Sequence, residues 1–130
     1  MGPVNWLGVV LAAAVAWLVN LLWHRVLFRP RRMLIASNER QPDSALSVAV
    51  ILVIAAIMLG HFYARIGVDM MKAKPWLYFM QSGGLAIAFV IPAVWLTQRR
   101  SALEPMRRLL DCVGWLVVYL AMGTVFWALG

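Results

Sequence analysis

Three side chains that could act on a ligand recur at four-residue intervals in the middle of the chain. His61, Arg65 and Asp69 would share one face of a helix, and Arg65 and Asp69 have the spacing of an ion pair. Gln81 and Ser82, in the next apolar segment, could complete a pocket with them. Histidine titrates near neutral pH, and arginine binds carboxylates or phosphates through a forked contact. These residues predict a small-ligand or proton site, with a structural network at the helix end as the alternative.

Three other polar residues are candidates because polar groups within apolar segments are costly. Asn20 is expected to form a hydrogen bond between helices, with a ligand contact as the alternative. His24 is interpreted as a histidine at the membrane interface. Asp111 follows Arg107 by four residues and Arg108 by three, which predicts an ion pair at the level of the lipid headgroups. A proton-handling role for Asp111 is the alternative.

No metal, cofactor or catalytic site is expected from the sequence. It contains no HExxH motif, no CxxC pair and no P-loop. His24 and His61 would lie on opposite sides of a membrane, roughly 20 Å apart at a rise of about 1.5 Å per residue, and so could not share an ion. The single cysteine, Cys112, is expected to be a small packed residue.

The composition indicates a membrane protein. Of the 130 residues, 64% are hydrophobic and only 13% are charged, which is too apolar for a soluble domain of this size. The formal net charge is +7, but the basic residues lie between apolar segments and form no solvated patch. A nucleic-acid partner is therefore not expected.

Four apolar segments are long enough to cross a bilayer as helices. They are residues 4–28, 45–68, 75–97 and 109–129. Pro92 lies inside the third segment and predicts a kink, because proline removes one backbone hydrogen bond. We expect one all-α domain over residues 1–130, an integral membrane bundle of four transmembrane helices.

Basic residues predict the orientation of the segments. Counting Arg25 and Arg65, which lie near the ends of their segments, five belong to the connection between the first and second segments and four to that between the third and fourth, against three between the second and third. Because loops rich in arginine and lysine stay in the cytoplasm, the first and third loops are predicted to be cytoplasmic. Both termini would then face outward.

A stripe of small residues runs along the first segment. Gly8, Ala12, Ala16 and Asn20 are spaced by four residues, so they lie on one side of a helix. Small residues allow another helix to approach closely, and an amide can form a hydrogen bond across the contact. The stripe predicts self-association or docking to a larger membrane complex, with packing inside the chain as the alternative.

Both ends of the chain resemble a small bacterial membrane family that is defined only by a domain of unknown function. The residues that carry the resemblance are Asn5-Trp6-Leu7, Leu22-Trp23, Leu27-Phe28, Leu110-Asp111, Gly114, Tyr119 and Met122-Gly123. The resemblance implies four spans in a bacterial inner membrane, with both termini in the periplasm by the charge rule. It implies no activity.

Two functions stay open at this stage. The first is a non-catalytic subunit or accessory protein of a membrane assembly, because no catalytic set of residues is found. The second is a small transporter or a protein that binds a ligand or lipid in an outward-facing polar pocket. Membrane lipids and either a homo-oligomer or a larger complex are the expected partners, and no cofactor is expected.

Overall fold

The computed structural model describes residues 3–23, 45–101 and 104–130, and these residues are almost entirely helical. The elements in chain order are α1 (Trp6–Leu22), α2 (Ala45–Ile66), α3 (Val68–Ala73), α4 (Trp76–Leu85), the π-helical turn η3 (Ala86–Val90), α5 (Ile91–Arg100) and α6 (Pro105–Leu129). No strand occurs in the described residues. The prediction of an all-α fold is confirmed.

Three of the helices are long and apolar enough to cross a membrane. They are Leu46–Ile66, the continuous helix Trp76–Arg100 and Pro105–Leu129. The apolar helix α1 has 17 residues, which is at the lower limit for a span. The predicted first segment continues to residue 28, but residues 24–28, and with them His24, lie outside the described residues. The structure therefore establishes three helices of spanning length.

Two predicted helix ends need correction. The second segment ends at Ile66, because Gly67 has a φ of 94°, a conformation that side-chain-bearing residues rarely adopt. The short helix α3 follows Gly67 and was not expected from the sequence. The last helix begins at Pro105 rather than at residue 109, with proline in its first turn, where no backbone donor is lost.

The irregularity predicted at Pro92 takes the form of a wider helical turn just before the proline. Residues Ala86–Val90 are π-helical, and the backbone N–H of Ile91 donates to the carbonyl of Ala86, five residues earlier. A proline ring clashes with the carbonyl four residues before it, and a wider turn relieves that crowding. The helix Trp76–Arg100 thus contains one extra residue in this turn.

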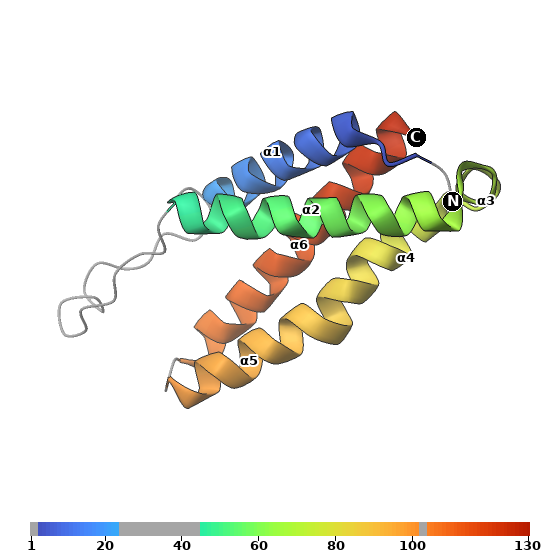
Figure 1. The fold of residues 1–130 in the computed structure, drawn as a ribbon. Helices are drawn as coiled ribbons and strands as arrows, with labels where there is room; N and C mark the ends of the chain where they lie inside the picture. The colour runs from blue at the N-terminus through green and yellow to red at the C-terminus, as the bar shows by residue number, and fades with distance from the viewer. Residues whose placement is uncertain (1–2, 24–44, 102–103) are drawn as a thin grey trace.

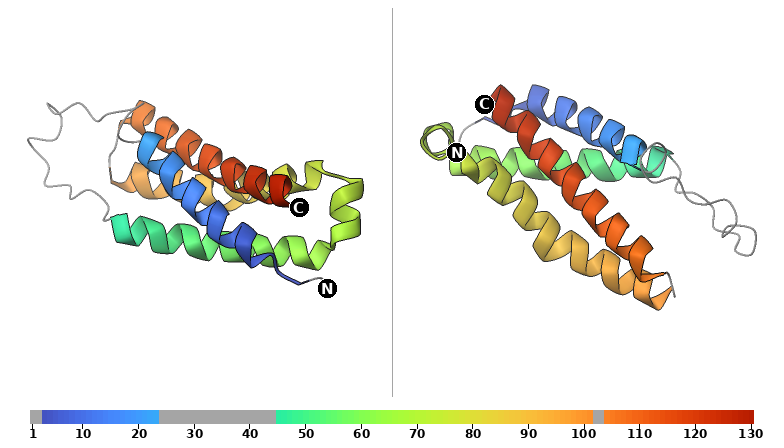
Figure 2. Two further views of the ribbon diagram at one scale, coloured as in Figure 1. Left: turned by 90° about the horizontal axis from the view of Figure 1, so that it is seen from above. Right: turned by 180° about the vertical axis from the view of Figure 1, so that it is seen from behind.

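The helices form an open bundle in which α6 is central. It packs against α1, α4, η3 and α5, while α2 packs against α1 and the beginning of α4. Beyond that contact, η3 and α5 diverge from α2 (Figure 1). Both ends of the chain lie at one end of the bundle, which we call the terminal end, and α5 meets α6 at the opposite end (Figure 2).

Small residues lie where the helices cross. Ala12 and Ala16 of α1 and Ala56 of α2 have no exposed surface. They join a core whose larger members include Leu52, Leu59 and Met122. Many large apolar residues point outward instead, including Leu7, Ile54 and Phe89. This inverted pattern suits a protein surrounded by lipid, where close helix contact stabilises more than hydrophobic burial does.

Candidate functional site

The first candidate is the polar group at the terminal end of α2. His61 and Arg65 are both exposed and lie one turn apart on this helix. The His61 Nδ1 is 2.8 Å from the carbonyl of Ile57, and the ring meets Trp6 edge-on at 6.0 Å between centroids. The tryptophan of α1 therefore covers part of the histidine.

Asp69 does not share this face, and the predicted Arg65–Asp69 ion pair is wrong. The helix ends at Ile66, and Asp69 belongs to the first turn of α3. Among the described residues, no salt bridge joins the Asp69 carboxylate to the Arg65 guanidinium. A four-residue spacing favours an ion pair only within one continuous helix, and Gly67 interrupts the helix between Arg65 and Asp69.

Ser82 lies in a helix crossing rather than beside His61. It is completely buried, and its hydroxyl donates to the carbonyl of Tyr78 at 3.0 Å. Its side chain fills the space over Gly123 of α6. Gln81, its neighbour, is half-buried. Of the two residues, only Gln81 reaches the surface, and within the described residues it forms no hydrogen bond with His61 or Arg65.

A buried tyrosine contact next to this crossing was missed by sequence reasoning. The Tyr63 hydroxyl donates to the carbonyl of Tyr78 at 2.8 Å, and its ring lies 5.0 Å from the rings of Tyr78 and Phe126. This contact ties α2 to α4 and α6. The sequence feature that could have indicated this contact is a tyrosine at the polar end of an apolar segment, because a buried hydroxyl needs a hydrogen-bond partner.

The small-residue stripe of α1 is used within the chain. Gly8 packs against the ring of Phe126, because an added Cβ would lie 3.0 Å from it, and Ala12 and Ala16 are fully enclosed. Asn20 is half-buried, and its amide forms no hydrogen bond with any described residue. The stripe thus forms an intramolecular helix contact, the alternative considered above.

At the opposite end, Asp111 has a partner other than the one predicted. The Gln98 side-chain amide donates to the Asp111 carboxylate at 2.6 Å. The Arg108 guanidinium lies 4.6 Å from the ring centroid of Trp95, a cation–π contact. Within the described part of the chain, no salt bridge joins Asp111 to Arg107 or Arg108, so the predicted ion pair is wrong. Gln98 and Trp95 of α5 therefore contact Asp111 and Arg108 in place of the predicted pair. Each lies thirteen positions before its partner in the sequence.

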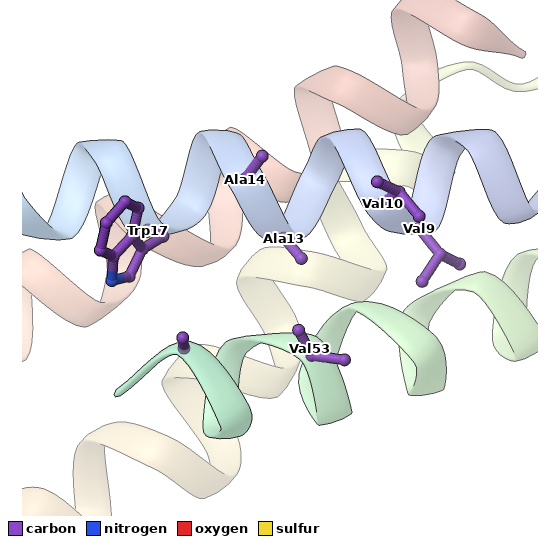
Figure 3. A pocket seen from close by; sticks show the side chains of 7 residues that line it. Val9, Val10, Ala13, Ala14, Trp17 and Val53 are labelled. Atoms are coloured by element: carbon purple, nitrogen blue, oxygen red, sulfur yellow. The ribbon is translucent and has the colours of Figure 1, made fainter. Parts of the chain in front are cut away.

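Two hollows in the described surface are apolar. The first, the α1–α2 groove, has a volume of about 280 Å³ and lies between these two helices (Figure 3). Small and branched residues line it: Val9, Val10, Ala13, Ala14, Trp17, Ala49 and Val53. The Nε1 of Trp17 is buried there and has no acceptor among the described residues.

The second hollow, the α2–η3 cleft, has a volume of about 490 Å³. It lies where the helix Trp76–Arg100 diverges from α2 (Figure 1). Aliphatic and aromatic residues of α2, α4, η3 and α6 line it: Ile51, Ile54, Ala55, Met58, Phe62, Leu85, Phe89, Val90 and Tyr119. Tyr119 brings its only side-chain polar group. Neither hollow contains a cluster of metal ligands, and no group of three or more His, Cys, Asp or Glu occurs in the described residues.

Residues near the two ends of the chain cap α1 and pack α1 against α6. The Asn5 side chain accepts the backbone N–H of Gly8 and caps α1. The Trp23 indole N–H donates to the carbonyl of Leu110 at 3.2 Å and lies directly over Gly114, where an added Cβ would be 2.6 Å from the indole nitrogen. Trp23, Leu110 and Gly114, which are among the residues that carried the family resemblance, therefore hold α1 against α6.

An all-helical fold with three apolar helices of spanning length fits the class of multi-pass membrane proteins. Within that class, the chain belongs to the family described as Protein of unknown function (DUF1761), which it matches over residues 7–127. No curated protein and no solved structure matches the chain.

Proposed function

We propose that this protein is a non-catalytic subunit or accessory protein of an assembly in a bacterial inner membrane. In this proposal α1 and the apolar residues after it form a fourth span, and both termini lie in the periplasm. The nine-to-three distribution of basic residues between the loops supports this orientation.

The observation that carries the proposal is the α1–α2 groove. Its walls include three alanines, Ala13, Ala14 and Ala49, on a surface where most exposed residues are large. In lipid, small residues at a surface let a second helix approach closely, and van der Waals packing then drives association. The groove fits a transmembrane helix of a partner subunit better than it fits a polar ligand, because Trp17 brings its only side-chain polar group.

The test is co-purification from native membranes after a change in the groove. Ala14→Leu fills the groove from an exposed position and is expected to remove the partner while the protein remains folded. Ala93→Leu, at an exposed position on α5, is the matched control and is expected to retain it. Retention of the partner by the Ala14→Leu variant would contradict the proposal. A partner with the mass of this chain would identify a homo-oligomer.

A second candidate function is anion binding at the terminal end. It is favoured by the Arg65 guanidinium, which Asp69 does not occupy, and by His61 one turn away on the same exposed face. Titration of an anionic lipid against wild type and Arg65→Gln, followed by melting temperature in detergent, tests it. Equal stabilisation of both proteins would remove this candidate.

A further inference from the structure

The helices on the two sides of the α2–η3 cleft diverge along their length. At the terminal end α2 and α4 are in contact. Toward the opposite end, η3 and α5 stay with α6 and move away from α2 (Figure 1). Ile54 and Met58 on one wall and Phe89 on the other are more than half exposed although they face a shared hollow.

The lining of the cleft selects a hydrocarbon occupant. Apart from the Tyr119 hydroxyl it offers no side-chain hydrogen-bonding group, so polar solutes would lose their hydration without compensation. An α-helix is about 10 Å wide, whereas α2 and α4 are in direct contact at the narrow end of the cleft. A single acyl chain can fill the narrow end, and a helix cannot.

The open end of the cleft leads toward positive charge. Arg99 and Arg100 end α5 and Arg107 lies in the first turn of α6; all three are exposed, and none forms a salt bridge within the described part of the chain. The carboxylate of Asp111 is held by Gln98. Glu104, exposed before α6, is the acidic residue closest in sequence to Arg107. Among the described residues, this end therefore has more guanidinium groups than available carboxylates.

The distance from the cleft to these arginines matches one leaflet of a bilayer. Val90 is the last lining residue of η3, and Arg100 follows it ten positions later in a continuous helix. At about 1.5 Å per residue this is about 15 Å. The hydrocarbon of one leaflet is also about 15 Å thick, half of the roughly 30 Å of the core. An acyl chain that reaches Val90 would thus have its headgroup at the level of the arginines.

We propose that the α2–η3 cleft binds one acyl chain of an anionic phospholipid, and that Arg99, Arg100 and Arg107 hold the headgroup phosphate. Guanidinium groups bind phosphate through paired, charge-assisted hydrogen bonds. The site is separate from the α1–α2 groove and does not depend on a protein partner.

The experiment measures lipid binding to the detergent-purified full chain by native mass spectrometry and by melting temperature. Phosphatidylglycerol, phosphatidylcholine with the same chains, and glycerol 3-phosphate are the probes. We expect phosphatidylglycerol to bind at least tenfold more tightly than phosphatidylcholine. Glycerol 3-phosphate alone is expected to give no stabilisation at the same concentration, because it lacks the acyl chain.

Two variants separate the two halves of the site. Arg99→Gln/Arg100→Gln should weaken phosphatidylglycerol binding by roughly tenfold or more, since each basic residue near an anionic headgroup contributes about 1 kcal/mol. Phosphatidylcholine binding should weaken less, because the choline ammonium offsets the charge of its phosphate. Ile54→Trp, at an exposed position in the cleft, should weaken both lipids. Lys72→Gln and Leu18→Trp, at exposed positions away from the cleft, are the matched controls and should bind like wild type.

Three results would overturn the proposal. Equal binding of both lipids by wild type would remove the headgroup site. Unchanged binding by Ile54→Trp would remove the acyl-chain site. Stabilisation by glycerol 3-phosphate equal to that by phosphatidylglycerol would identify a site for the free anion instead of a lipid.

Discussion

At the scale of single residues, the contact between Trp23 and Gly114 leaves no room for a side chain at the glycine. An added methyl group at Gly114 would lie 2.6 Å from the indole nitrogen and would displace the ring from its hydrogen bond to Leu110. Overpacking of this kind costs about 1–3 kcal/mol. Gly84, in contrast, has open space around it.

We therefore expect Gly114→Ala to lower the melting temperature in detergent. Gly84→Ala is the matched control and should raise it or leave it unchanged, because alanine in a helix is favoured over glycine by roughly 0.5–1 kcal/mol. Both substitutions add one methyl group, so the comparison varies only the space around the glycine. Equal effects of the two substitutions would show that Trp23 does not restrict the position.

The buried hydroxyl of Tyr63 gives a second test at this scale. Tyr63→Phe removes the donor to the carbonyl of Tyr78 and keeps the ring contacts, so we expect a loss of about 1 kcal/mol in the free energy of unfolding. Tyr119→Phe removes a hydroxyl that forms no hydrogen bond with the described residues and should change stability by less. Chemical denaturation in mixed micelles would measure both. A larger loss from Tyr119→Phe would contradict the assignment.

At the scale of elements, the Gln98–Asp111 hydrogen bond joins α5 to α6 at the opposite end. Gln98→Leu leaves a half-buried carboxylate without this donor, and we expect a loss of about 1.5 kcal/mol, as for other hydrogen bonds to charged groups. Thr97→Val is the neighbouring control, because the Thr97 hydroxyl bonds only its own helix, at the Ala93 carbonyl. Thermal melting should separate the two variants, and Gln98→Leu/Asp111→Leu should recover part of the loss.

The sequence predicted most of the helices and few of the side-chain partners. Apolar runs located the elements because helix length in a membrane is set by bilayer thickness. Partners that depend on distant elements, such as Gln98 for Asp111, leave no local pattern. The Arg65–Asp69 prediction was wrong because a single glycine, Gly67, ended the helix.

At the scale of the whole molecule, the antiparallel helices bring both termini to one end (Figure 2). If this end is periplasmic, alkaline phosphatase fused after Gly130 should be active, and a fusion within residues 31–40 should be inactive. The expectation follows from nine basic residues in the first and third loops against three in the second. A cytoplasmic signal from the fusion at Gly130 would reverse the orientation and place Arg99 and Arg100 in the outer leaflet.

The π-helical turn acts as a phase correction along the helix Trp76–Arg100. Before it, the side that meets α6 includes Tyr78, Ser82 and Ala86, each four residues apart. After it, that side includes Trp95 and Gln98. In an unbroken α-helix each residue turns about 100°, so without the extra residue these last two would rotate away from α6.

Removal of one residue therefore has opposite consequences on the two sides of this turn. Deletion of Ala88, inside it, gives a regular helix that keeps Gln98 facing Asp111. Deletion of Ala93, one turn later in α5, rotates the remainder of the helix by about 100° and separates that pair. We expect the Ala88 deletion to lower the melting temperature less than the Ala93 deletion, although each removes one exposed alanine. In this span, the position of a length change matters more than the residue that is lost.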